Sequence, residues 1–117
     1  VSILHDDIQD YDTDVNGPSV TFTATVESFD GNVQDVILYY STDNNNWQQI
    51  EMNLSNDSSL YEAIITFDQE GIIIYYYITA SNDMGQFSQY PQLEDYVSFV
   101  YGDLMDRVSL IISLMDC

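Results

Sequence analysis

The sequence predicts an all-β fold, an antiparallel β-sandwich of about seven strands followed by a C-terminal extension. Residues 72–80 form an unbroken run of β-branched and aromatic residues that is apolar at both odd and even positions, as in a central strand. Several other segments alternate between apolar and polar residues, which is typical of strands with one face in solvent. Clusters of Gly, Asn and Asp separate these segments, and no helix-length pattern occurs before residue 102.

The central strand is expected to present two different faces, because successive side chains of a strand point to opposite sides. One face ends in a small alanine and has a single hydroxyl, so we expect it to join the core; it comprises Ile72, Ile74, Tyr76, Ile78 and Ala80. The other face comprises Ile73, Tyr75, Tyr77 and Thr79.

Six further strands are expected at residues 1–4, 19–28, 33–41, 47–52, 60–67 and 95–101. The first is expected at a sheet edge, and the last shows no preference between its two faces. Alternation predicts that the inward residues of two strands are Val20, Phe22, Ala24, Val26, Tyr61, Ala63, Ile65 and Phe67. Residues 82–94 are expected to form a polar loop. The predicted domain thus spans residues 1–101, with an acidic entry loop at 5–17 and an extension at 102–117.

The charge of the chain is unusual and limits its partners. Among 117 residues there are 20 Asp and Glu but a single Lys or Arg, Arg107, and the formal net charge is −19. Nucleic acid and anionic lipid are excluded as partners, because both require a basic face. No segment approaches the roughly 20 apolar residues of a membrane-spanning helix, so membrane insertion is not expected. The acidity fits either a highly soluble surface or a secreted protein that binds cations.

The strongest candidate ligand set is the acidic pattern in the entry loop, Asp10-x-Asp12-x-Asp14-x-Asn16-Gly17. Calcium prefers six to eight oxygen ligands, and alternating loop positions can supply them. The pattern matches the first half of an EF-hand loop, but Thr23 stands where that loop carries a bidentate Glu. Two interpretations stay open, a solvated acidic linker or a simple Ca²⁺ site at Asp10, Asp12, Asp14 and Asn16, with Asp6 and Asp7 as further ligands.

Two glycosylation sequons lie together in a predicted loop, at Asn53-Leu54-Ser55 and Asn56-Asp57-Ser58. Sequons also arise by chance in chains rich in Asn and Ser. If both are used, Asn53 and Asn56 carry glycans and the protein lies at a cell surface.

No residue pattern indicates an enzyme. His5 is the only histidine, and no Ser- or Cys-centred motif accompanies it, so we expect an exposed or lightly packed side chain. Cys117 has no partner for an internal disulfide or a zinc site. We therefore predict a protein without catalytic residues.

Two segments are candidates for contact with a partner. If Tyr39 lies on a strand next to Tyr75 and Tyr77, the three outward rings form an aromatic patch that binds a sugar or a protein, or else only stabilises the sheet. The extension repeats an alternating pattern at Val108, Leu110 and Ile112. It fits a strand that joins another chain or domain, a segment packed on its own domain, or a disordered tail.

Four motifs occur in an order typical of one protein family: Val36-x-Leu38-x-Tyr40-Ser41, Trp47-x-x-Ile50-x-Met52, Leu60-Tyr61-x-Ala63-x-Ile65 and Tyr76-Tyr77-Ile78-x-Ala80-x-Asn82-Asp83-x-Gly85. Over residues 18–101 the chain resembles the immunoglobulin-like, fibronectin type III-like modules of secreted or cell-surface bacterial and archaeal proteins. The resemblance implies a seven-stranded sandwich without shared catalytic residues. The paired cysteines of antibody domains are absent here.

The resemblance implies a structural or adhesive module of an extracellular surface protein or filament. Its expected partners are copies of itself or adjacent domains, joined through the terminal segments and by Ca²⁺ if the acidic loop binds it. The alternative is an accessory module of a secreted hydrolase that binds a carbohydrate or a protein through the tyrosine face. Fold analogy does not decide between them.

Overall fold

The computed structural model describes residues 1–55, 59–92 and 95–103. These residues form ten strands and one single-turn helix, so the predicted all-β class is confirmed. In chain order the elements are β1 (Ser2–Leu4), β2 (Tyr11–Asp12), α1 (Thr13–Asn16), β3 (Ser19–Glu27), β4 (Val33–Ser41), β5 (Gln48–Glu51), β6 (Asn53–Leu54), β7 (Leu60–Thr66), β8 (Ile72–Asn82), β9 (Phe87–Tyr90) and β10 (Val97–Gly102).

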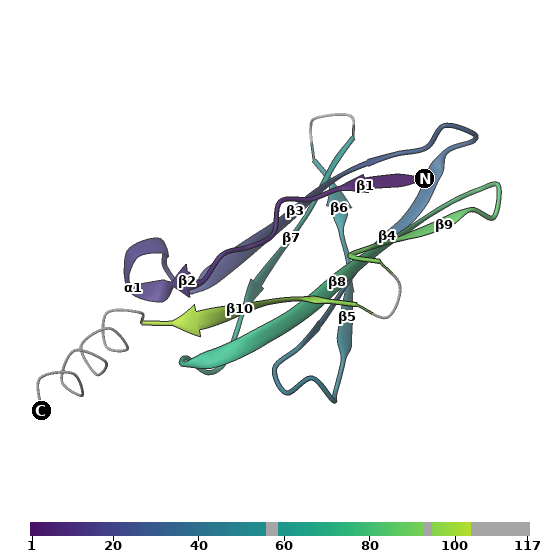
Figure 1. Cartoon of the computed structure of the whole chain (residues 1–117). Coiled ribbons are helices and arrows are strands. Elements are labelled where there is room, and N and C mark those ends of the chain that lie inside the picture. Colours follow the sequence, from purple (N-terminus) through teal and green to yellow (C-terminus); the bar gives the residue numbers. More distant parts are fainter. Residues whose placement is uncertain (56–58, 93–94, 104–117) are drawn as a thin grey trace, which may run out of the picture.

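The strands form two sheets that pack against each other as a sandwich (Figure 1). The first sheet has the order β1-β3-β7-β6, and the second has the order β2-β10-β8-β4-β5, with β9 also paired to β8. All pairs are antiparallel except the short pair of β2 and β10. Within the described residues, no helix has the length and apolar character needed to cross a membrane.

Strand β8 lies at the centre of the second sheet, as its composition predicts. It pairs with β4 on one side over almost its whole length. On the other side its first half pairs with β10 and its second half with β9. Both edges of β8 are therefore hydrogen-bonded, which fits a strand built almost entirely of β-branched and aromatic residues.

The core lies between the two sheets and follows the predicted alternation. Every residue expected to face inward on β3 is buried, and so are Ala63, Ile65 and Phe67 around β7. On the predicted core face of β8, Ile74, Tyr76, Ile78 and Ala80 are buried and Ile72 is partly buried. Thr79, which was expected on the other face, is also buried. The last strand, β10, buries Phe99 and Tyr101, which the sequence pattern leaves undecided.

Seven of the ten strands match the seven expected ones, and the other three are β2, β6 and β9. The prediction of a continuous polar loop at residues 82–94 is wrong, because β9 extends the hairpin with β8. The entry loop also contains β2 and the four-residue helix α1. Each of these elements has two to four residues, too few for a periodic pattern to be visible in the sequence.

The turn between β3 and β4 is tied to the turn after β8 by two adjacent side chains. Asn82 is buried, and its amide donates to Ser28 Oγ at 2.9 Å and to the Asp30 carbonyl at 3.0 Å. Its Oδ1 accepts the backbone N–H groups of Met84 and Gln86. Asp83 Oδ1 accepts the Asn32 N–H at 2.8 Å, and the Asp83 N–H donates to the Asn32 carbonyl. These bonds hold the two turns as one unit.

The prediction that His5 is exposed or lightly packed is wrong, since the structure leaves only 6% of its surface accessible. The chain passes from the first sheet to the second between β1 and β2 (Figure 1). His5 directly follows β1, within this connection. Its Nδ1 lies 2.5 Å from the Thr23 carbonyl of β3, and its Nε2 lies 2.6 Å from the Tyr76 hydroxyl of β8. One side chain thus bridges both sheets.

The partners of His5 define its tautomer. A carbonyl only accepts, so Nδ1 carries the hydrogen that is donated to Thr23. The Tyr76 hydroxyl accepts the Ile8 N–H at 3.0 Å and keeps its own proton to donate to Nε2. Burial raises the pKa of Tyr76, so the hydroxyl stays protonated. Every polar atom of the bridge is paired in the neutral state of both side chains.

We predict that Tyr76→Phe lowers the free energy of unfolding by about 1–3 kcal/mol, because His5 Nε2 and the Ile8 N–H lose their buried partner. Urea denaturation monitored by circular dichroism measures this change. The matched control is Tyr75→Phe, the outward neighbour, for which we expect less than about 0.5 kcal/mol. Equal effects of both substitutions would show that the bridge contributes no stability.

Candidate functional site

The outer face of the second sheet carries a row of five aromatic side chains, here called the aromatic row: Tyr39, Trp47, Tyr75, Tyr77 and Tyr96. Tyr39 of β4 lies directly opposite Tyr77 of β8 in the strand register. Their rings stack with centroids 4.7 Å apart and an angle of 13° between their planes. The expected neighbourhood of Tyr39, Tyr75 and Tyr77 on adjacent strands is therefore present.

Two members of the row, Trp47 and Tyr96, were not among the predicted interaction residues, although both fall in strands that the sequence predicted at residues 47–52 and 95–101. The Trp47 ring lies 5.2 Å from Tyr77 and 6.4 Å from Tyr96, and Tyr96 lies 5.3 Å from Tyr75. Each of the two residues immediately precedes a strand, β5 or β10, rather than lying within it. Strand alternation does not assign a face to a residue just outside a strand. An aromatic residue beside a turn could still have indicated a contact residue.

The row borders a shallow cleft of about 220 Å³ lined by Trp47, Tyr77, Gln89, Asp95 and Tyr96. Asp95 Oδ1 accepts the Tyr96 N–H at 2.9 Å, which fixes the carboxylate beside the rings. The Gln89 amide points to the Gln92 and Asp95 carbonyls, at 3.4 Å and 3.5 Å. The cleft thus combines three aromatic rings with one carboxylate and one amide.

The β4–β5 loop holds Trp47 in place through Asp43. Asp43 Oδ1 accepts the N–H groups of Asn45 and Asn46 and the Ser41 hydroxyl, and Oδ2 accepts the Asn46 amide. Asn44 adopts a positive φ of 59°, which Asn tolerates, and its amide donates to the Tyr96 hydroxyl at 3.3 Å. One carboxylate therefore shapes the loop that presents Trp47 and contacts Tyr96.

The environment alters the acidity of two groups in this region. The N–H groups of Asn46 and Asn45, with the Ser41 hydroxyl, hold the pKa of Asp43 far below its usual range. Burial, with a smaller effect from Tyr39, raises the pKa of Tyr77. Asp43 is therefore ionised and Tyr77 neutral at physiological pH.

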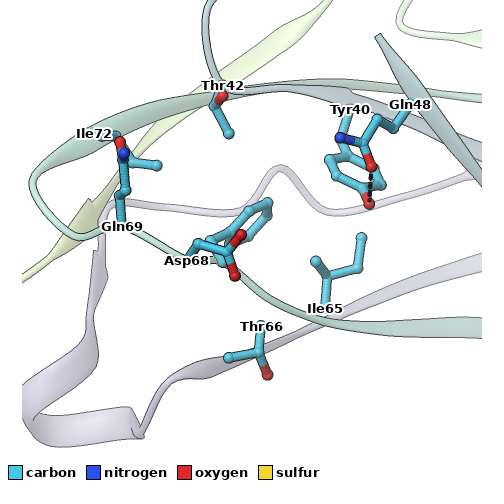
Figure 2. A pocket seen from close by; sticks show the side chains of 9 residues that line it. Tyr40, Thr42, Gln48, Ile65, Thr66, Asp68, Gln69 and Ile72 are labelled. Carbon is cyan, nitrogen blue, oxygen red and sulfur yellow. Dashed lines mark hydrogen bonds between the residues drawn. The ribbon is translucent and has the colours of Figure 1, made fainter.

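A second cavity of about 260 Å³ lies at the end of the sandwich, between β4 and β5 on one side and the end of β7 on the other (Figure 2). Figure 2 shows Tyr40 donating to Gln48 Oε1, at 3.2 Å, across from Ile65 and Thr66. Asp68 is the only carboxylate among its described lining residues. The described lining therefore lacks the carboxylate pair that glycoside hydrolysis uses.

The candidate calcium ligands have separate structural roles. Asp12 caps α1, with Oδ1 accepting the Asp14 N–H at 3.0 Å, and Asn16 donates to the Asp12 carbonyl. Asp10 Oδ1 accepts the Val100 N–H of β10. Asp7, the proposed extra ligand, accepts the Tyr90 hydroxyl. In residues 1–55, 59–92 and 95–103 no three His, Cys, Asp or Glu side chains gather as a metal site. Calcium binding stays a prediction.

The other predicted site residues are partly placed. Asn53 lies in β6 with an exposed side chain, which leaves it accessible for glycosylation. Asn56 lies outside the described residues, and so do Val108, Leu110, Ile112 and Cys117 of the extension.

Comparison with known proteins gives no relative from which a role can be transferred. No protein-family model matches the chain, and no curated protein matches it significantly. The fold and the outer face define an all-β sandwich domain with an aromatic cleft, and its function has to be argued from these features alone.

We predict that Asp43→Ala loosens the β4–β5 loop, lowers the melting temperature at pH 7 and shifts the emission of Trp47. Because the folded-state pKa lies below the ordinary value of 3.8, the carboxylate stabilises the fold above that pH. Its contribution is lost as the pH falls through the folded-state pKa. The difference from the wild type should therefore shrink in melts below pH 3.8.

The control for this experiment is Asp35→Ala, which removes an exposed carboxylate from β4. It should leave both the melting temperature and the Trp47 emission nearly unchanged. A difference that persists undiminished at low pH would contradict the role of the ionised Asp43.

For calcium, we expect thermal melting to detect a bound ion. A specifically bound Ca²⁺ raises the melting temperature beyond the effect of Mg²⁺ at matched ionic strength. Asp12→Asn keeps an oxygen for the α1 cap but removes a charged ligand, so it should reduce the calcium effect. Equal increases in melting temperature with Ca²⁺ and Mg²⁺ would contradict the calcium hypothesis.

Proposed function

We propose that the chain is a non-catalytic, immunoglobulin-like adhesive module of an extracellular surface protein or filament. The observation that carries the proposal is the aromatic row on the outer face of the second sheet. Stacked aromatic side chains on a rigid sheet supply contact area at little cost in conformational entropy. Such a face suits adhesion to another protein surface.

The strand order supports the immunoglobulin-like part of the proposal. Immunoglobulin-type sandwiches place strands A, B, E and D in one sheet and C, F and G in the other. The order β1-β3-β7-β6 corresponds to A-B-E-D, and β4, β8 and β10 correspond to C, F and G. Strand β5 then takes the place of an additional strand beside C.

The placement of the strand ends supports a module in a tandem or filament arrangement. Strand β1 starts at one end of the sandwich, and β10 runs to the opposite end (Figure 1). A following domain would therefore extend the long axis of this one. Strand β5 forms one margin of the second sheet, and its four residues are all exposed, so it can accept an added strand.

The state of His5 supports a non-catalytic role. A general base needs a ring nitrogen that is free to reach a substrate proton. Both His5 nitrogens are used, one by the Thr23 carbonyl and one by the Tyr76 hydroxyl. The histidine is therefore explained by the bridge between the sheets.

We expect the chain to self-associate with increasing concentration, as a filament module does, and sedimentation velocity measures this. Deleting residues 103–117 should abolish the association if the extension forms the joint. A strictly monomeric chain at millimolar concentration, with and without Ca²⁺, would contradict the assembly role.

Carbohydrate binding is the second candidate function, favoured by the presence of Gln89 and Asp95 beside the rings of the cleft. Sugars bind to proteins through such mixtures of ring faces and hydrogen-bonding groups. Binding on a glycan array that disappears in Tyr75→Ala and Tyr77→Ala would favour this alternative. Absence of any glycan signal would leave the adhesive module as the better account.

A further inference from the structure

The cleft of the aromatic row has a composition suited to a positive charge, and this inference rests on the proposed adhesive function. Trp47, Tyr77 and Tyr96 line the cleft, and the face of an aromatic ring carries the negative part of its quadrupole. Asp95 adds a full negative charge at the same cleft. Rings that attract cations, combined with a carboxylate, form the type of cage that binds ammonium and guanidinium groups.

The orientation of the rings favours a compact cation over a sugar. The plane of Trp47 is inclined by 52° to that of Tyr77 and by 50° to that of Tyr96. Tyr77 also stacks on Tyr39, so part of its ring surface is already in use. A pyranose requires a flat, open ring face, whereas inclined rings surround a smaller group from several sides.

The charge of the whole chain supports the same class of ligand. At a net charge of −19 the protein as a whole attracts cations and repels anions. The only Lys or Arg of the sequence, Arg107, lies outside the described residues. No lysine or arginine from residues 1–55, 59–92 or 95–103 can therefore fill the cleft.

The polar groups of the cleft leave acceptors for such a cation. Asp95 uses Oδ1 for the Tyr96 N–H, and a carboxylate has a second oxygen that can accept a hydrogen bond. Gln89 donates through Nε2, so its Oε1 remains an acceptor on a side chain that lines the cleft. A guanidinium can stack on a ring while its N–H groups donate to a carboxylate, which an ammonium does less well.

We propose that the cleft of Trp47, Tyr77, Tyr96, Asp95 and Gln89 binds an arginine side chain of a basic polypeptide segment, and that this contact anchors the adhesive partner. The guanidinium lies among the inclined rings and donates to Asp95. The surrounding negative charge draws the basic segment to the surface, and the cleft gives the contact a defined position.

Titration with a hexa-arginine peptide tests the proposal, and isothermal calorimetry gives the affinity. Trp47 is the only tryptophan, so its fluorescence reports binding at the cleft itself. We expect saturable binding that changes Trp47 emission and weakens with added salt. A hexa-alanine peptide with the same termini should leave the emission unchanged.

Two substitutions distinguish binding at the cleft from nonspecific electrostatic attraction to the acidic protein. Asp95→Asn keeps an acceptor for the Tyr96 N–H and should weaken hexa-arginine binding about three- to fivefold. Tyr96→Leu keeps apolar bulk but removes a ring and should weaken it by a similar factor. The matched control is Glu62→Gln on β7, which removes one charge from the other sheet, far from the cleft. It should change the affinity less than about 1.5-fold, which corresponds to the smallest free energies measured for exposed ion pairs. Melting curves confirm that the variants fold.

Several results would overturn the inference. Equal weakening by Glu62→Gln and Asp95→Asn would mean diffuse attraction without a site, and absence of saturable binding would mean no site at all. Preferred binding of a neutral oligosaccharide at the same residues would also overturn it, while supporting the carbohydrate alternative. None of these results touches the self-association experiment, so the inference and the proposed function can fail separately.

Discussion

The structure depends on β8 being hydrogen-bonded along both edges while it contributes to both faces of the second sheet. Inward, Tyr76 and its neighbours pack against the first sheet. Outward, Tyr75 and Tyr77 start the aromatic row. Because β4, β10 and β9 all pair with this one strand, its register decides which side chains meet on either face.

The same strand links the core to the crossing of the chain between the sheets. Tyr76 reaches across to His5 and Ile8, and His5 in turn reaches β3. In a protein with almost no basic side chains, ion pairs cannot supply such long-range connections. Neutral hydrogen bonds and aromatic contacts connect distant parts of this chain instead, because they do not require opposite charges.

The long strands were predictable from sequence because their alternation and composition are set by burial. The faces of β3 and β7 followed directly from period two. The short strands β2, β6 and β9 were not predictable, since their pairing depends on where the long strands lie. His5 was misjudged for the same reason: its partners are a carbonyl from β3 and a hydroxyl 71 residues away.

For the candidate site, the sequence located the tyrosines but not the cleft. Tyr39, Tyr75 and Tyr77 lie inside strands, so alternation placed them on one face. Trp47, Tyr96 and Asp95 lie in loops just before β5 and β10, whereas the sequence pattern had assigned them to strands at residues 47–52 and 95–101. The orientation of these side chains depends on the loop that Asp43 organises and on the pairing of β10 with β8.

The pair Asn82 and Asp83 has a consequence for how this domain can vary. Their side chains fasten the β3–β4 turn to the β8–β9 turn, so neither turn is free to lengthen alone. The space beside Gly31 is limited in the same way, because a Cβ there would lie within 2.2 Å of the Asp83 carboxylate. Insertions at this end of the sandwich therefore require matching changes in both turns. The β4–β5 loop is organised by its own carboxylate, Asp43, and is also joined to Tyr96 by the Asn44 amide.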